Sequence, residues 1–357
     1  MAEQDPYRAL ARRLDQTPNG YPATESGVEL RILAQLFAPE EAALAACLHL
    51  TPEPAKAIAA RLGRDAGEVN SLLKGMARRG LIALERQPGQ LAFALMPFAV
   101  GFYEMQAGRL SAELAALVEE YFHTAYPQLI AAQPALHRVI PVEEAVPAGV
   151  EVMPYESASA LLDGAAAWGV VDCICREQQK LVGKGCAAPM DVCMVMSATK
   201  GAFDQSPGIR ALTREGALAT LRKAEEAGLV HSTSNTRGDI WYMCNCCTCC
   251  CGILRGIAEF GLQHSIARSA FCMRVDQAAC TACESCLERC HFGALTVHDV
   301  ARVDAARCIG CGLCASVCPS DALSLERRPD APDVPEDMRA WRQARAQARG
   351  VDLSQIG

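Results

Sequence analysis

The sequence lacks the marks of several common protein classes. Its 357 residues contain no uninterrupted apolar run of about 18 residues, the minimum for a membrane-spanning helix. The first twenty residues hold no apolar signal core, and no GxGxxG or P-loop fingerprint for a nucleotide is present. Aromatic residues make up only 5% of the chain, and the net charge is −7. We therefore predict a cytoplasmic protein with no membrane span, and the charge argues against a nucleic-acid partner.

Cysteine, in contrast, is abundant. The chain has 20 cysteines, and all except Cys47 lie between Cys173 and Cys318. A reducing cytosol disfavours a disulfide framework in a chain of this size. Metal binding is the remaining explanation for so many thiols.

The order of periodic segments and turns predicts an α+β multidomain protein. We expect a helical lead-in (1–38), a mainly helical domain (39–130), a cysteine-rich α+β middle domain (131–272), a duplicated strand-loop-helix-strand unit (273–328), and a linker with a basic helical tail (329–357). The tail helix has little apolar face, so we expect it to be peripheral.

Residues 39–96 read as three helices followed by a hairpin across Gln87-Pro88-Gly89-Gln90, and a further helix is expected from Phe98 to about Tyr126. This order resembles a winged-helix domain, with Asn70 to Arg79 in the recognition-helix position. Residues 1–110 carry 12 Lys/Arg and 12 Asp/Glu, so the domain has no basic footprint. We therefore favour docking of a protein, such as an oxidoreductase subunit, over DNA binding.

One cysteine pattern occurs twice, 28 residues apart. The first copy is Cys280-x2-Cys283-x2-Cys286-x3-Cys290, and the second is Cys308-x2-Cys311-x2-Cys314-x3-Cys318-Pro319. The match extends beyond the cysteines, because Arg274-Val275-Asp276 repeats as Arg302-Val303-Asp304. An internal duplication accounts for both copies.

This segment resembles the bacterial two-cluster ferredoxins, in which the fourth cysteine of each run binds the other cluster. The resemblance implies two [4Fe–4S] clusters with crossed ligands. One would take Cys280, Cys283, Cys286 and Cys318, and the other Cys308, Cys311, Cys314 and Cys290.

The middle domain holds two further cysteine groups. They consist of Cys173, Cys175, Cys186 and Cys193, and of Cys244, Cys246, Cys247, Cys249, Cys250 and Cys251. Their number predicts one or two additional iron–sulfur clusters with ligands drawn from both groups, and structural zinc is the less favoured alternative. Arg176, Lys180 and Lys184 lie among the first group, where they can offset cluster charge or form a solvated helix face.

The whole arrangement resembles a family of ferredoxin-type proteins found mainly in anaerobic bacteria and archaea, with a CxCR segment and a CNCCxCCC run. The resemblance implies electron transfer with a redox partner protein. Two alternatives stay open: an oxidoreductase whose middle-domain cluster binds substrate, and a redox-responsive regulator that uses the N-terminal domain on DNA.

Overall fold

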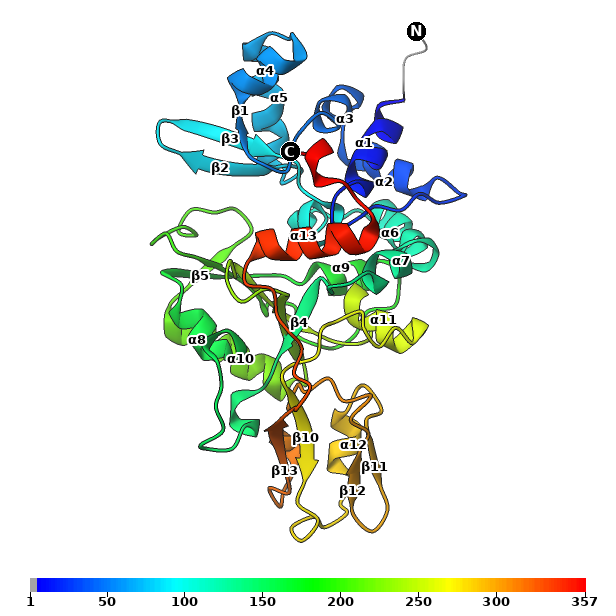
Figure 1. Ribbon diagram of the computed structural model, residues 1–357, viewed down its shortest axis with the longest axis vertical. Coiled ribbons are helices and arrows are strands. Elements are labelled where there is room, and N and C mark those ends of the chain that lie inside the picture. The colour runs from blue at the N-terminus through cyan, green and yellow to red at the C-terminus, as the bar shows by residue number, and fades with distance from the viewer. Residues whose placement is uncertain (1–4) are drawn as a thin grey trace. The chain divides into compact units, whose positions relative to one another are not determined.

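The computed structural model describes residues 5–357, so the first four residues of the predicted lead-in lie outside it. The chain forms two units, one of residues 1–132 with 342–357 and one of residues 133–341. Helices and small sheets occur in both (Figure 1). No helix in the described part of the chain is both long and apolar enough to cross a membrane.

The first unit is mainly helical. Its helices are α1 (Pro6–Asp15), α2 (Val28–Leu36), α3 (Pro39–Ala45), α4 (Ala55–Leu62), α5 (Ala66–Arg78), α6 (Ala112–Thr124) and α7 (Tyr126–Ala131). Strands β1 (Glu53–Pro54), β2 (Ala83–Gln87) and β3 (Gln90–Ala94) form an antiparallel sheet in the order β1-β3-β2. The expected hairpin is thus confirmed, and a buried aromatic cluster of Tyr21, Phe98, Phe102 and Tyr121 forms part of the core.

Two sequence-based expectations for this unit are wrong. The helix expected from Phe98 does not begin there: irregular turns follow Pro97, and α6 starts only after Ser111, whose side chain accepts a hydrogen bond from the Leu114 amide. The tail helix α13 (Met338–Arg349) is not peripheral, because Arg345 is fully buried and donates to the carbonyls of Pro18 and Leu129. The guanidinium of an arginine has several N–H donors and can satisfy several buried carbonyl groups. A helix can therefore be buried through an arginine although its apolar residues do not predict burial.

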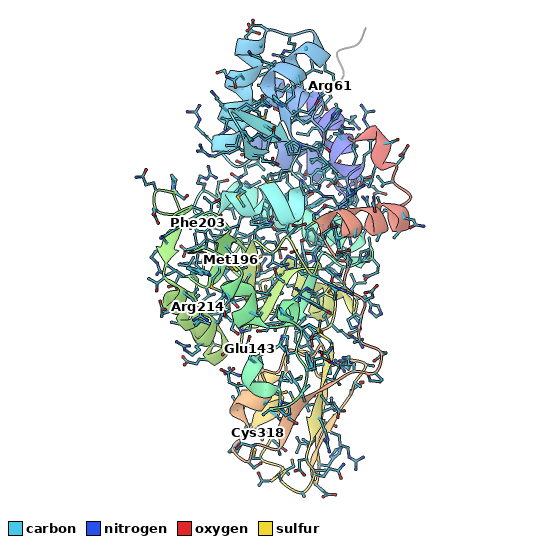
Figure 2. The ribbon with its side chains drawn as sticks, turned by 60° about the vertical axis from the view of Figure 1, so that its left-hand side comes forward. Arg61, Glu143, Met196, Phe203, Arg214 and Cys318 are labelled. Carbon is cyan, nitrogen blue, oxygen red and sulfur yellow. The ribbon has the colours of Figure 1, made fainter. Side chains whose placement is uncertain are left out.

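The second unit is built on a six-stranded antiparallel sheet in the order β4-β8-β9-β6-β5-β7. Its strands are β4 (His137–Ile140), β5 (Ala167–Val171), β6 (Cys193–Ser197), β7 (Arg210–Leu212), β8 (Val230–Ser234) and β9 (Tyr242–Cys246). Helices α8 (Ala158–Asp163) and α10 (Arg214–Glu226) cover one face, packing Leu162 and Leu221 against Met194, Met196 and Met243. Met196 is labelled in Figure 2.

Because strand side chains alternate between faces, Cys193, Cys244 and Cys246 point away from the methionine face. Helices α9 (Ile174–Leu181) and α11 (Gly252–Phe260) begin directly after Cys173 and Cys251, which occupy their N-cap positions. The sheet and these two helix starts therefore bring distant cysteines to one place.

The duplicated segment also belongs to this unit. It contains β10 (Phe271–Val275), α12 (Ser285–Arg289), β11 (Leu295–Val297), β12 (Ala301–Val303), a 3-10 turn (Ala315–Val317) and β13 (Leu323–Arg327). Strand β10 pairs with β13 and β11 with β12, both antiparallel. Figure 1 shows β10 and β13 side by side, with α12, β11 and β12 next to them.

Candidate metal centres

The duplicated segment encloses two cavities, each lined by four cysteines. One is lined by Cys290, Cys308, Cys311 and Cys314, and the other by Cys280, Cys283, Cys286 and Cys318. Figure 2 labels Cys318. Each set joins three cysteines of one motif copy to the last cysteine of the other.

Strand pairing explains why the sets cross. The antiparallel pairs β10–β13 and β11–β12 place the end of each copy beside the start of the other. Backbone amides also point at the sulfur atoms, since the Ala294 amide lies 3.4 Å from Cys290 Sγ and the Ala301 amide 3.3 Å from Cys280 Sγ. Such amides favour a negatively charged sulfur.

The two cysteine loops differ in their surroundings. Ala282 and Glu284 in the first loop have φ of 53° and 64°, and the equivalent Gly310 and Gly312 have 72° and 82°. A Cβ on Gly310 would lie 2.1 Å from the Phe271 carbonyl oxygen, whereas Glu284 is exposed. The second loop is therefore held tightly, and the first is open to solvent.

Cys272 joins this region although the sequence reasoning did not assign it. Its thiol is hydrogen-bonded to Cys308, and that bond is the main reason that the pKa of Cys308 is lowered to about 6. The position equivalent to Cys272 in the second copy is Val300, so the repeat gives no signal for this residue.

Between Cys173 and Cys251 the thiols fall into two groups, and each group draws on both cysteine-rich segments. The larger is a closed ring of six thiols. Hydrogen-bond contacts join Cys173 to Cys175 and Cys193, Cys175 to Cys251, Cys193 to Cys244, Cys244 to Cys246, and Cys246 to Cys251.

The smaller group contains Cys186, Cys247, Cys249 and Cys250, whose sulfur atoms all lie within 4.8 Å of one another. The turn from Cys247 to Cys251 is closed by a hydrogen bond from the Cys251 amide to the Cys247 carbonyl, 3.1 Å long. A hydrogen bond from Cys250 lowers the pKa of Cys247 to about 5.

Arg176 lies beside both groups. Its side chain is 2% exposed and donates from Nη2 to the Asn245 carbonyl at 2.6 Å, but Nε and Nη1 have no hydrogen-bond partner. Burial lowers the pKa of Arg176, and the nearby Cys173, Cys247, Cys193 and Cys246 outweigh that effect and raise it. Lys180 and Lys184, which the sequence placed with Arg176, are exposed.

A buried polar chain runs behind the sheet. His231 lies 3.0 Å from a Glu225 carboxylate oxygen through Nε2 and 2.5 Å from Asn245 Oδ1 through Nδ1. Asn245 is held in turn by donating to the Val192 carbonyl. Asn245 stands between Cys244 and Cys246 on β9, so its side chain and their thiols point to opposite faces of the sheet.

Residues 301–324 match the Fer4 family, a 4Fe-4S binding domain. The matched residues include Cys308, Cys311, Cys314 and Cys318. No curated protein and no solved structure matches the chain. The match and the clustered thiols identify an iron–sulfur protein of the electron-transfer class, with a ferredoxin-type segment. Because the match covers a small part of the chain, it identifies the segment rather than the family of the whole protein.

Proposed function

We propose that this protein relays single electrons through two [4Fe–4S] clusters in the ferredoxin-type segment and a further iron–sulfur cluster in the middle domain. The observation that carries the proposal is the pair of cavities, each lined by four cysteines. In this assignment one cluster takes Cys280, Cys283, Cys286 and Cys318. The other takes Cys290, Cys308, Cys311 and Cys314.

The surroundings of the two cavities support a direction for the relay. Around the Cys308–Cys314 loop, the Val142 amide donates to the Cys311 carbonyl at 2.9 Å, and Ser269 Oγ donates to the Gly310 carbonyl at 2.7 Å. Cys283 and Glu284 of the other loop are exposed. The Cys280 cluster is therefore the one that faces an external redox partner protein, and the Cys308 cluster is the inner one.

The inner cluster has a connection to the middle domain on both sides of Cys290. Arg289 Nη2 donates to the carbonyls of Glu225 and Glu226 at 3.1 and 2.8 Å, and His291 Nε2 lies 2.8 Å from the Gly228 carbonyl oxygen. These acceptors belong to the end of α10 and the turn after it. From Glu225, hydrogen bonds run through His231 to Asn245, which is the residue between the ring cysteines Cys244 and Cys246 on β9.

The six-thiol ring supports a further cluster because of its charge balance and its ligand number. Arg176 presents two unpartnered buried donors there, which calls for an anionic neighbour such as a thiolate-ligated cluster. Four thiolates complete a cubane, so six thiols provide more than one cubane requires. We assign Cys173, Cys175, Cys193, Cys244, Cys246 and Cys251 as its ligand pool.

The test is anaerobic purification with iron and sulfide quantitation, followed by EPR of the reduced protein. The ferredoxin pair alone gives about eight iron atoms per chain, and the ring adds about four or more. Cys318→Ser should remove the EPR signal of the Cys280 cluster, and Cys246→Ser that of the ring. The control is Cys47→Ser, outside the cysteine-rich region. Less than eight iron atoms in the reconstituted wild-type chain would overturn the proposal.

A further inference from the structure

Among the described residues, the four-thiol group is the one cysteine set whose sulfur atoms all lie within 4.8 Å of one another. Cys186 Sγ lies 3.9 Å from Cys247 Sγ and 3.6 Å from Cys250 Sγ, and the sulfurs of Cys249 and Cys250 are 3.7 Å apart. These short sulfur–sulfur separations determine whether the group fits a single metal ion or an iron–sulfur cluster.

A single ion in a tetrahedron of thiolates sets the sulfur–sulfur distance by geometry. With a zinc–sulfur bond of about 2.3 Å, the edge of the tetrahedron is about 3.8 Å. The three observed separations, 3.6, 3.7 and 3.9 Å, lie on either side of that value. In a cubane, each thiolate binds a different iron atom, so its sulfurs stand farther apart.

The ferredoxin-type segment provides a comparison within the same molecule. Each of its two cysteine sets lines a cavity. Among residues 5–357, no other group of three or more cysteine, histidine or acidic side chains brings its ligand atoms within 4.8 Å of one another. The two cysteine sets of the ferredoxin-type segment are therefore more open than the four-thiol group.

The surroundings of the compact set favour an ion. Four thiolates with a divalent ion carry a net negative charge, and Arg176, which is 2% exposed, lies near Cys247 with two unpartnered nitrogens. Soft thiolate ligands in a tetrahedron select zinc among divalent metals, and four protein ligands leave no open position for substrate.

We propose that Cys186, Cys247, Cys249 and Cys250 bind one Zn²⁺ in a closed structural site. The ion fastens the loop that carries Cys186 to the turn after β9. Zinc has no redox chemistry, so electrons that reach the middle domain go to the ring and not to this site. The proposal does not rest on the relay, and zinc and iron are measured separately.

The experiment uses the full chain, purified anaerobically, with zinc and iron quantified by mass spectrometry. We expect about one zinc per chain and, in zinc X-ray absorption, four sulfur neighbours at about 2.3 Å. Cys249 and Cys186 are exposed, so Cys249→Ser and Cys186→Ser leave the core intact. Each should lose most of the zinc and keep wild-type iron content and EPR signals, as Cys47→Ser keeps both metals.

Two outcomes overturn the proposal. If either variant loses iron in proportion, the group belongs to an iron–sulfur cluster or holds iron itself. If zinc stays at the wild-type level in both variants, the ion binds elsewhere. Protection of Cys249 from alkylation by added zinc in the metal-free chain gives a second readout, and equal alkylation with and without zinc also counts against the site.

Discussion

Cys272 lies on β10 next to the inner cavity, where its thiol is hydrogen-bonded to Cys308. If Cys308 binds iron, a thiol that donates to the ligating sulfur withdraws electron density from it and favours the reduced cluster. A residue outside the four-cysteine motif can therefore adjust a reduction potential.

We predict that Cys272→Ala lowers the midpoint potential of the Cys308 cluster, by an amount on the order of tens of millivolts, without changing iron content. An EPR-monitored anaerobic redox titration measures it, and Cys47→Ala serves as the control. An unchanged potential would contradict the prediction, and a loss of iron would show Cys272 to be a ligand.

His137 makes stability depend on pH. Burial lowers the pKa of His137 from 6.5 to about 4, and its Nε2 has no hydrogen-bond partner. The neutral form is favoured in the fold, so its stability contribution is complete above pH 6.5 and is lost as pH falls toward 4. The whole loss is about 3 kcal/mol, of which about 2 kcal/mol is gone by pH 5.

The variant His137→Gln should lack this pH dependence. We expect the denaturant midpoint of the wild type to fall more steeply than that of the variant between pH 7 and 5, measured in parallel under anaerobic conditions. Parallel curves for the two proteins would show that His137 does not titrate in this window.

At the scale of elements, the two cysteine loops offer a matched pair of substitutions. Gly310→Ala adds a Cβ that would lie 2.1 Å from the Phe271 carbonyl oxygen, at a φ of 72°. Ala282, at the equivalent place, has a side chain at a similar φ of 53°. We expect Gly310→Ala to cost more than about 1 kcal/mol and to lose the Cys308 cluster, while Ala282→Ser retains both clusters. Iron content and EPR spectra measure the loss of clusters, and similar cluster losses in both variants would contradict the prediction.

The sequence predicted elements well where the signal is local. The hairpin β2–β3 lies where the turn across Gln87-Pro88-Gly89-Gln90 predicts it. The helix expected from Phe98 is wrong because apolar periodicity continues across turns that Pro97 and Gly101 introduce. The buried position of α13 depends on Arg345, which a hydrophobic pattern counts as solvent-facing.

For the candidate site, the resemblance to the two-cluster ferredoxins implied the crossed cysteine sets, and the strand pairs β10–β13 and β11–β12 give their structural reason. The division of the middle-domain thiols depends on which strands adjoin in the sheet: β6 lies beside β9, which brings Cys193 near Cys244. Pairing between strands that are so far apart in the sequence cannot be predicted from the local residue pattern. The ligand assignments themselves stay predictions that metal analysis tests.

At the scale of the whole molecule, metal removal should affect the two units differently. Residues 133–341 contain every cysteine except Cys47, whereas the first unit has a core of its own around Tyr21, Phe98 and Tyr121. Metal-dependent domains lose folding free energy when the metal is removed.

We predict that anaerobic chelation removes hydrogen-exchange protection from β9 and from residues 280–318, while α5 and α6 keep theirs. Mass spectrometry of peptides from both units measures the difference, and a buffer exchange without chelator is the control. Equal loss of protection in both units would contradict it.

The first unit is assembled from both ends of the chain, since residues 342–357 belong with residues 1–132. Arg345 supplies donors to the Pro18 and Leu129 carbonyls only after translation has passed the second unit. On the ribosome, therefore, every residue of the second unit emerges before the first unit can be completed. Metal insertion into the second unit can therefore precede completion of the first.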